Sequence, residues 1–560
     1  MGKAISKKPV STKHKDFIIK HPMLWLTASV ILVNMWCLTL GYTELDDSIF
    51  IRDFHAYNED LSNLFTSFHR GVFSAANDSY YRPFFLNSII INYVFSGQNP
   101  AGYHLVNIIF HLLAVLLLFK LFKKLEVKEL DAFLLTLIFA VHPVLSQAVA
   151  WIPGRNDTLL AVFTFCFLIC SINYANSSKI KWLMLSFITL ACALFTKETA
   201  LFNAPVAFVI LIYILKKNWL EKKIILQYLV WIGAVILWYG VRSTATLQTV
   251  HLDPRNILQD FVGRWPVVIQ YIGKIFFPFN LNVFPILEDT VYYYGIAAIL
   301  FLALIIFFSK GKQLRSVIGG IAIFFLFLLP ALLVPRSLNE QLFEHRLYLP
   351  IIGILLVLPQ TILFKNNLRD KQLLWRGIAI AIVLAGINFY RQPNFNDPLS
   401  FWSSATESSP NSAYAVMMYG ERIAEQDTAK GYGLIRRAYF LDPNQKYINY
   451  YYGKMLQNID SVQASEKYFL KEKKTSNYYE CDFYLARIAL EKKPPEIDAA
   501  SKYLKGFLAK DSLNEMGNNN LLLLYLQTKE KAKALEQIKR MQNNGLPVSS
   551  DIMNRVNSIQ

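Results

Sequence analysis

Cysteine is scarce in this chain, with five in 560 residues, and acidic residues are outnumbered, with 40 Asp and Glu against 57 Lys and Arg. Four cysteines lie in apolar runs. Cys166 and Cys170 are four residues apart on one expected helix, a spacing that does not normally form a disulfide, so cysteine usage says little about the compartment. No zinc-finger spacing or RNA-binding signature accompanies the net charge of +17, which argues against a nucleic-acid partner.

Much of the Lys and Arg lies in short loops between apolar runs, where positive charge sets membrane orientation and suits anionic lipid. No small-residue cleavage site follows the basic N-terminus and the first apolar run, Met23 to Tyr42. We therefore expect residues 1–22 to be a basic cytoplasmic segment and the first helix to remain uncleaved and lead outward.

Long apolar runs recur up to Tyr390 and then stop. With 54% hydrophobic residues, this pattern predicts an all-α, multi-pass transmembrane domain over residues 23–392 and a soluble domain over 393–560. Leu86 to Phe95 is expected to be an interfacial helix, and 243–290 an outer loop with an even number of crossings. About eleven spans are expected: Met23–Tyr42, Ala101–Phe122, Phe133–Trp151, Thr158–Tyr174, two in Trp182–Leu215, Ile224–Val241, Val291–Phe308, Val317–Val334, Ile351–Phe364 and Leu373–Tyr390.

The last part of the chain changes to polar, helix-rich sequence. Asp442-Pro443-Asn444 echoes Ser409-Pro410-Asn411 at an offset of about 34 residues, and small and aromatic residues recur at helical spacing. This texture is typical of degenerate tetratricopeptide repeats stacked into a solenoid, with Asn518 to Asn543 as a cap. An irregular helical bundle is the alternative. An odd span count places this domain on the outer side.

Asp46 and Asp47 follow the first expected span directly. Carboxylates at the mouth of a membrane helix are costly to bring near hydrocarbon, which favours a functional role. One could take a proton from an attacking hydroxyl as a general base. Alternatively, the pair could hold a divalent cation such as Mg²⁺ or Mn²⁺ against a phosphate leaving group. The non-functional alternative is a solvated pair of charges at a helix end.

A second polar group follows Arg82. His104, Asn107 and His111 are spaced i, i+3 and i+7, which places them on one face of the second expected span and favours a cavity-facing position. Metal ligation is less favoured, because a two-His helix site normally uses an i, i+4 pair. Hydrogen bonds between helices are the simpler alternative.

Further polar clusters occupy expected outer turns. Arg or Lys beside a carboxylate suits a lipid-linked phosphate, since Arg binds it bidentately and Lys as a point charge. Each cluster alone could instead be a cation at the membrane interface. The candidates for the donor phosphate are Arg155, Lys197, Arg336 and Arg346, and those for the cavity lining are Arg82, His104, Asn107, His111, His142, Asp157, Glu198, Glu344 and Tyr348.

These motifs, in order, resemble one family. They are Asp46-Asp47, Tyr81-Arg82-Pro83, Gly102 to Asn107 with His111, Phe139 to Pro143, Gly154 to Leu159, Thr196-Lys197-Glu198 and Glu344 to Pro350. Followed by tetratricopeptide repeats, the set is similar to the transmembrane-and-tetratricopeptide-repeat protein O-mannosyltransferases, which have the GT-C fold. The resemblance implies a polyprenyl-phosphate sugar donor, an inverting transfer, a Ser or Thr acceptor on an extracytoplasmic protein bound by the repeats, and catalysis by Asp46 and Asp47.

The chain departs from the family in its short repeat array and in His345, which interrupts the expected Glu-Arg spacing. Its basic N-terminus and compact loops indicate a bacterial inner membrane, with the active site and repeats on the periplasmic side. Alternative functions are transfer of an oligosaccharide from a polyprenyl diphosphate, or transfer of sugar to lipid or envelope polysaccharide. A transporter or membrane scaffold is the non-enzyme alternative, but the ionisable clusters lie at outer helix ends rather than at mid-membrane.

Overall fold

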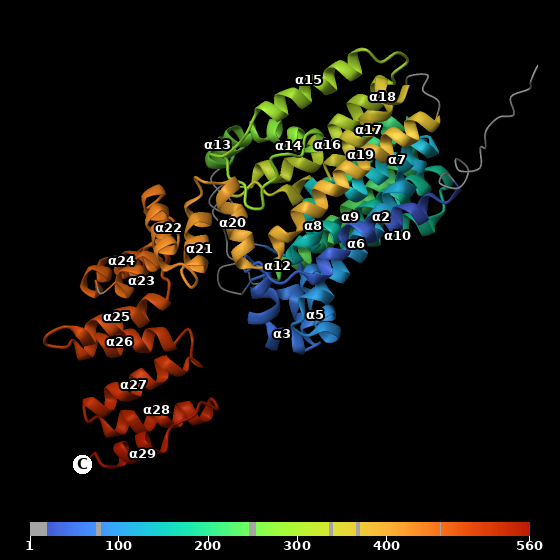
Figure 1. Ribbon diagram of the computed structural model, residues 1–560. Coiled ribbons are helices and arrows are strands. Elements are labelled where there is room, and N and C mark those ends of the chain that lie inside the picture. The colour runs from blue at the N-terminus through green and yellow to red at the C-terminus, as the bar shows by residue number, and fades with distance from the viewer. Residues whose placement is uncertain are drawn as a thin grey trace, which may run out of the picture. The chain divides into compact units, whose positions relative to one another are not determined.

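The computed structural model describes residues 20–73, 80–245, 254–334, 340–365, 370–459 and 461–559. Helices dominate throughout these ranges, which confirms the all-α prediction (Figure 1). The chain divides into two compact units, Met1–Ser409 and Pro410–Gln560. Helix α20 (Pro398–Ser408) lies in the first unit, so the division falls after this helix rather than at residue 393.

The first unit is a multi-pass membrane domain. Six of its described helical segments are long and apolar enough to cross a bilayer, and one bent pair could form a seventh span. The six are α2 with η1 (Pro22–Thr39), α6 (Pro100–Lys124), η5 with α9 (Ile152–Ser177), α12 (Lys222–Ser243), α16 (Leu314–Leu333) and α19 with η10 (Asp370–Phe395). The bent pair is α7 (Glu129–Val141) with η4 and α8 (Pro143–Ala150), which meet at 49°.

Four shorter apolar helices coincide with the remaining expected spans: α10 (Ile180–Thr196), η6–α11–η7 (Glu198–Ile214), α15 (Tyr293–Phe307) and α17–η9 (Ile351–Gln360). Every expected span thus corresponds to an apolar helix, although the number of crossings is only approximate. Two more short helices are α5 (Pro83–Ser96), where an interfacial helix was expected, and α14 (Val267–Phe276). Residues 246–253 of the expected outer loop lie outside the described residues.

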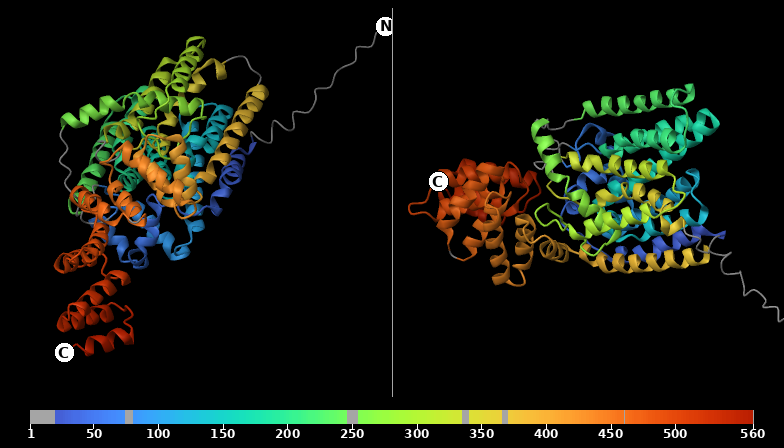
Figure 2. Two further views of the ribbon diagram at one scale, coloured as in Figure 1. Left: turned by 60° about the vertical axis from the view of Figure 1, so that its left-hand side comes forward. Right: turned by 90° about the horizontal axis from the view of Figure 1, so that it is seen from above.

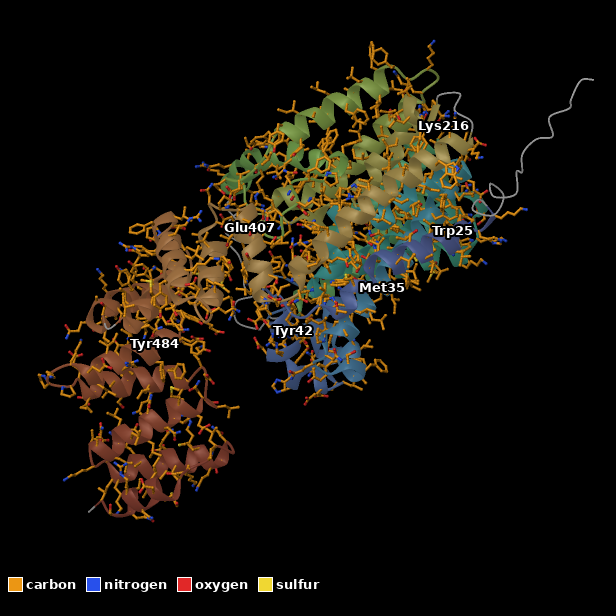
Figure 3. All side chains as sticks on the ribbon, in the orientation of Figure 1. Trp25, Met35, Tyr42, Lys216, Glu407 and Tyr484 are labelled. Carbon is orange, nitrogen blue, oxygen red and sulfur yellow. The ribbon has the colours of Figure 1, made fainter. Side chains whose placement is uncertain are left out.

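Smaller helices complete this unit. The first outer loop contains η2 (Ile49–Asp53), α3 (His55–Glu59), α4 (Asn63–Thr66) and η3 (Ser67–His69). Later ones are α13 (Pro254–Arg264), η8 (Glu344–Leu347) and α18 (Ile362–Lys365). Figure 3 shows Tyr42 and Lys216 towards opposite ends of the helical bundle, as expected for an outer and an inner end of the spans.

Local chemistry explains the helix boundaries that matter for the site. Asn99 caps α6 by accepting a hydrogen bond from the Ala101 amide at 3.0 Å, and Pro100 occupies the first turn, where its missing N–H costs nothing. At the bend between α7 and η4, the His142 side chain accepts from the Val144 amide at 3.2 Å. Pro143 cannot donate to the preceding turn, so the helix breaks there and the chain turns towards α8.

Close helix packing fixes the segment that follows η8. A Cβ on Gly320 of α16 would lie 2.6 Å from the Gly353 carbonyl oxygen, and one on Gly353 of α17 would lie 2.4 Å from the Gly320 oxygen. Only glycine allows this approach. All seven residues of α17, Ile351 to Val357, are buried. The turn before α17 is therefore held against α16.

The second unit is built from helical hairpins, followed by α29 (Ser550–Asn557); Figure 2 shows them stacked one after another. The Gly420 and Gly431 backbones pack closely in the first pair, as the recurrence of small residues indicated. Tetratricopeptide-like repeats are thus confirmed, and the expected cap, 518–543, falls within the last pair. The pairs are α21 (Ala413–Ile423) with α22 (Thr428–Leu441), α23 (Ile448–Asn458) with α24 (Val462–Ser476), α25 (Glu480–Glu491) with α26 (Ile497–Leu508), and α27 (Glu515–Gln527) with α28 (Lys531–Asn543).

Candidate active site

One cleft of the membrane unit gathers most of the charged outer turns. It holds about 1110 Å³ of non-protein space, the open solvent at its mouth included. Its walls come from the first outer loop, the residues before α5, the start of α9, η6, the last turns of α16, and η8. The titratable residues that line it are Asp46, Tyr80, Arg82, Asp157, Lys197, Glu198, His345 and Arg346.

The two adjacent carboxylates of the first loop have different surroundings. Asp46 lines the cleft, and among the described residues its side chain accepts no hydrogen bond. Asp47 is buried and points into its own loop. It accepts hydrogen bonds from the Thr43 amide at 2.7 Å, the Thr43 hydroxyl at 3.0 Å, the Glu44 amide at 2.9 Å and the Ser48 amide at 3.0 Å. Asp46 is therefore placed to react, and Asp47 to shape the loop.

The shape of that loop is unusual, because Glu44 has a left-handed backbone with φ of +54°. Residues with a Cβ avoid this conformation, so it needs support from neighbouring contacts. Asp47 supplies it through the Glu44 amide, and the Glu44 carboxylate pairs with Arg52 at 3.0 Å. The Gly41 amide also donates to the Asn396 carbonyl at 2.8 Å, which anchors the loop to η10.

The electrostatics of the cleft suit a proton acceptor at Asp46. Burial and, to a smaller extent, the neighbouring charge of Asp47 raise the pKa of Asp46 to about 7, against the opposing effect of Arg82. Burial also raises the pKa of Asp47, against the hydrogen bonds from Thr43, Ser48 and Glu44, which lower it. A general base works best when its pKa lies near the working pH, and Asp46 meets this condition.

Two ion pairs cross the cleft wall. Arg82 holds Glu198 bidentately, with Nη2 to Oε1 at 2.6 Å and Nε to Oε2 at 3.1 Å. Lys197 holds Asp157, with Nζ to Oδ1 at 2.8 Å. These pairs join segments that are distant in sequence, and they supply carboxylate partners to two of the three Arg and Lys side chains that line the cleft. Both pairs are held in fixed geometry around the space.

Arg346 is the third of these cations and has no carboxylate partner among the described residues. Its Nη1 atom is buried without a hydrogen-bond partner, and its guanidinium lies 6.0 Å from the Phe343 ring centroid. An unpaired buried guanidinium N–H costs free energy that an anionic ligand would recover. The structure therefore leaves one cation available for phosphate.

An aromatic wall stands beside Arg346. Trp151, Phe343 and His345 pack with ring centroids 5.1 to 5.9 Å apart and planes inclined by 23° to 32°. Trp151 Nε1, His345 Nδ1 and the Oδ1 atom of Asn156 are buried without hydrogen-bond partners in the described structure. Burial lowers the pKa of His345 well below its ordinary value, so this imidazole is neutral. The wall combines flat aromatic rings with hydrogen-bond donors and acceptors.

Glu344 anchors the η8 turn that carries His345 and Arg346. It is fully buried, and its carboxylate contacts Lys274 Nζ at 2.6 Å, Arg391 Nη1 at 2.5 Å and the Asn282 amide at 2.7 Å. Arg391 also donates to the Pro143 carbonyl at 3.0 Å. This network joins α14, α19 and the α7–α8 bend to η8. Glu344 was expected in the cavity lining, but it lies beneath the lining and holds it.

Arg155, a predicted phosphate ligand, also lies away from the cleft. It is fully buried, and its guanidinium donates to Asn107 Oδ1 at 2.8 Å, Asn92 Oδ1 at 2.8 Å, the Tyr103 carbonyl at 2.8 Å and the Ser88 carbonyl at 3.1 Å. Asn107 in turn donates to the carbonyls before α9. Together they fix the turn that presents Trp151, Asn156 and Asp157.

His104 and His111 of α6, with His142 after α7 and Tyr348 after η8, make hydrogen bonds between segments, as the simpler alternative held for the α6 face. His111 contacts the Tyr348 hydroxyl at 2.6 Å and the Ala140 carbonyl at 3.0 Å. His142 contacts the Ile275 carbonyl at 2.9 Å, and His104 lies 3.4 Å from the Gly41 carbonyl oxygen. None of these four residues lines the cleft, so they form a supporting layer beneath it. Arg336 lies outside the described residues.

The donor set fits a divalent cation poorly. The described residues contain no group of three or more His, Cys, Asp or Glu side chains that could hold a metal ion. Asp47 has both oxygens occupied by amides and a hydroxyl, and Asp157 and Glu198 are paired with cations. Among the described residues that line the cleft, Asp46 is the one carboxylate that is neither hydrogen-bonded nor paired with a cation, so no step is assigned to a metal here.

Sequence reasoning missed Trp151 and Asn156 as cleft residues, and it noted His345 only as a departure from the family. Trp151 and Asn156 stand within the turn Trp151 to Asp157, from which only the charged residues were selected. A signal was present, because Trp beside Asn in an outer turn offers both an apolar ring and an amide. Lys274 and Arg391 were also missed as partners of Glu344.

A match to a family model indicates which class of protein this chain resembles. Residues 75–248 match the family model described as dolichyl-phosphate-mannose-protein mannosyltransferase. This range includes Arg82, Asp157, Lys197 and Glu198 of the cleft, whereas Asp46 and Arg346 lie outside it. The match confirms the resemblance that the motifs indicated.

The individual relatives are described as protein O-mannosyl-transferases. A protein O-mannosyl-transferase of Caenorhabditis elegans is 34% identical over 142 residues, which are 25% of this chain and 20% of that protein. Protein O-mannosyl-transferase TMTC4 of Mus musculus is 29% identical over 209 residues, which are 32% of this chain and 28% of that protein. The matched part of the chain thus spans under a third of each relative's length.

Among solved structures, the Archaeoglobus fulgidus oligosaccharyltransferase tethered with an acceptor peptide aligns with a TM-score of 0.39 and 12% identity. The alignment covers 75% of this chain and 59% of that chain.

Proposed function

We propose that this protein is a membrane glycosyltransferase that moves a sugar, mannose in the first instance, from a polyprenyl-phosphate carrier to Ser or Thr hydroxyls of extracytoplasmic proteins. The observation that carries the proposal is the cleft itself. Within the described part of the chain, it is lined by a carboxylate that accepts no hydrogen bond, Asp46, and by a guanidinium without a carboxylate partner, Arg346. A base and a phosphate-binding cation at one cavity are the two groups that this reaction needs.

The chemistry follows from those positions. Asp46 takes the proton of the acceptor hydroxyl as its oxygen attacks the anomeric carbon. The bond between that carbon and the phosphate oxygen breaks, and the electron pair leaves with the polyprenyl phosphate, which inverts the anomeric centre. Arg346 stabilises the charge that develops on the leaving phosphate, while the Arg82–Glu198 and Lys197–Asp157 pairs fix the cleft wall. The protonated Asp46 then releases its proton to solvent.

Three further parts of the proposal concern the surroundings. The repeat unit, Pro410–Gln560, binds the acceptor protein, since helical solenoids present extended surfaces to polypeptides. The membrane is a bacterial inner membrane, a proposal that the basic N-terminus and compact loops support. The cleft and repeats lie on the periplasmic side, a proposal that the distribution of Lys and Arg in the loops supports. A divalent cation beside Asp46 has no part in the proposed step, and chelation tests this.

The test is transfer by the full chain in liposomes. Radiolabelled polyprenyl-phosphate mannose is the donor, and extracytoplasmic proteins from cells lacking the gene are the acceptors. Asp46→Asn is expected to reduce transfer by about 10²- to 10⁴-fold, the usual effect of removing a positioned base. The matched control is Asp60→Asn, an exposed carboxylate of the same outer loop. Equal transfer by both variants would contradict the assignment of Asp46.

The acceptor class is tested with the same preparation. If label enters protein only when residues 410–560 are present, the acceptor is a protein presented by the repeats. If the truncated chain labels lipid as well as the full chain does, the acceptor is a lipid or a polysaccharide precursor. Transfer of a large glycan from a diphosphate donor, with none from the monophosphate, would instead indicate an oligosaccharyltransferase.

A further inference from the structure

Besides Arg346, three residues that line the cleft keep a polar atom without a hydrogen-bond partner in the described part of the chain. The atoms are Trp151 Nε1, Asn156 Oδ1 and His345 Nδ1. The three residues are only 5% to 8% exposed. A buried polar atom that stays unpaired costs free energy, which a ligand with matching polar groups would recover. Three such atoms at one cavity therefore indicate a polar ligand.

The hydrogen-bonding roles of the three atoms differ. The Trp151 indole N–H donates, and the Asn156 side-chain oxygen accepts, because Nδ2 of the same amide already donates to the Pro153 carbonyl at 3.2 Å. His345 Nε2 lies 4.0 Å from Asp157 Oδ2. A carboxylate on that side favours the proton on Nε2, which leaves Nδ1 as an acceptor. One donor and two acceptors match hydroxyl groups, which both donate and accept.

The rest of the wall is flat and aromatic. Trp151, Phe343 and His345 have ring planes inclined to one another by 23° to 32°. The face of an aromatic ring carries partial negative charge, so it attracts the polarised C–H bonds of a pyranose. A phosphate has no such C–H face, and an isoprenoid chain would leave the three polar atoms unpaired. The wall therefore fits a neutral hexose.

The wall is held in place before any ligand binds. The Gly154 amide donates to the Trp151 carbonyl at 2.9 Å, and a Cβ on Gly154 would lie 2.6 Å from the Gln147 carbonyl oxygen. This close approach fixes the turn that carries Trp151 and Asn156. On the other side, the buried Glu344 anchors η8. Because little ordering remains for binding, the positions of the polar atoms discriminate between ligands.

We propose that Trp151, Asn156 and His345 form the subsite for the donor sugar and select a neutral hexose through hydrogen bonds to its hydroxyls. This inference rests on the proposed function. The subsite adjoins the phosphate site, since Arg346 follows His345 directly and its guanidinium lies 6.0 Å from the Phe343 ring centroid. A hexose joined to a phosphate at Arg346 therefore lies against the wall.

The kinetic test pairs deletions in the protein with deletions in the donor. Trp151→Phe and His345→Phe each keep an aromatic ring and remove polar ring atoms. The matched control is Trp219→Phe, at a residue that is 58% exposed and does not line the cleft. Transfer by the full chain in liposomes is measured with polyprenyl-phosphate mannose and with its 3-, 4- and 6-deoxy analogues. With the unaltered chain, at least one deoxy donor should lose about tenfold or more in kcat/KM, because a site built to bind a hydroxyl rejects its absence.

The two deletions should not add when they remove the same hydrogen bond. Each variant is expected to lower kcat/KM for the mannose donor about tenfold. For the deoxy donor that lacks the matching hydroxyl, the same variant should cost less than about twofold, since that bond is already missing. Trp219→Phe should change none of these values. A variant that lowers kcat/KM by one factor for every donor, or that lowers none, removes its residue from the subsite, and this result for both variants overturns the proposal.

A binding measurement separates this inference from the proposed function. Polyprenyl-phosphate mannose and bare polyprenyl phosphate compete with a photoreactive polyprenyl phosphate for the full chain. The mannose-bearing lipid should compete about tenfold better with the unaltered chain, and the advantage should vanish in the double variant Trp151→Phe with His345→Phe. That pattern without sugar transfer by the unaltered chain would keep the subsite and refute the proposed function. Equal competition by the two lipids would overturn the subsite, whereas sugar transfer would still support the proposed function.

Discussion

Replacing Glu344 by Gln should destabilise the membrane unit more than any single change in the cleft lining. Glu344 and Lys274 have fully buried side chains, and Arg391 is 4% exposed. The substitution keeps the shape of residue 344 but leaves the two cations without a counter-charge. Breaking a buried ion pair in this way costs about 3–5 kcal/mol, and the Asn282 amide also loses a charged acceptor.

A second substitution separates charge from shape. In the double variant Lys274→Met with Glu344→Gln, one buried cation remains with a neutral partner, so the net charge of the cluster returns to that of the unaltered protein. We expect this variant to recover about half of the lost stability, because the two sites are in contact and their effects are not additive. Lys274→Met alone should be destabilising, since Glu344 then relies on Arg391 only.

The assay is the fraction of folded protein that survives heating in detergent, measured by size-exclusion chromatography. Activity at a permissive temperature is measured on the same samples, because displacement of η8 should lower kcat/KM for the donor through Arg346. A Glu344→Gln variant as stable as the unaltered protein, or a double variant no more stable than Glu344→Gln, would refute the account of this network.

Four further outcomes follow from the cleft. Asp47→Asn should lower stability by about 1–3 kcal/mol, because an amide replaces an acceptor-only carboxylate against three N–H groups; a thermal scan of the detergent-solubilised protein measures it. Arg346→Lys should lower kcat/KM about tenfold, with a fall in kcat, because Lys lacks the bidentate fork that holds the leaving phosphate; unaltered kcat/KM would remove Arg346 from the phosphate site. The base form of Asp46 is the carboxylate, so kcat/KM should fall about tenfold per pH unit below its pKa of about 7 and level off above it. EDTA should leave transfer unchanged, whereas loss that Mg²⁺ or Mn²⁺ restores would place a cation beside Asp46.

The pKa of Asp46 also links pH to stability. Its pKa in the folded protein is raised above the ordinary value, so the protonated form is favoured by folding. The charged form therefore opposes folding at any pH above the folded-state pKa, and that penalty disappears below the ordinary pKa of Asp. Asp46→Asn should accordingly be more stable than the unaltered protein at pH 8, with the difference vanishing near pH 4.

The sequence predicted which turns meet, because charge in the loops fixes the side of the membrane on which each helix ends. Charge in the loops predicts one side of the membrane for a set of charged residues that the structure gathers at one cleft: Asp46, Arg82, Asp157, Lys197, Glu198 and Arg346. It works because the clusters stand at helix ends, where topology alone limits their positions.

Sequence could not predict how neighbours divide their roles. Asp46 and Asp47 differ only in the direction of one side chain, which the left-handed turn at Glu44 decides. Arg155 and Arg346 stand in similar motifs, yet one is enclosed by Asn92, Asn107 and backbone carbonyls, and the other has no carboxylate partner among the residues that the structure describes. Partners 116 residues apart, such as Arg82 and Glu198, are set by tertiary packing, which no local pattern contains.

In the proposed mechanism, Asp46 drives sugar transfer to protein hydroxyls. Its most direct test is glycopeptide mass spectrometry of extracytoplasmic proteins from cells that express the unaltered chain, Asp46→Asn or Asp60→Asn at equal levels. We expect hexose on Ser and Thr peptides to be lost with Asp46→Asn and kept with Asp60→Asn. Glycopeptides that are the same in all three strains would contradict it.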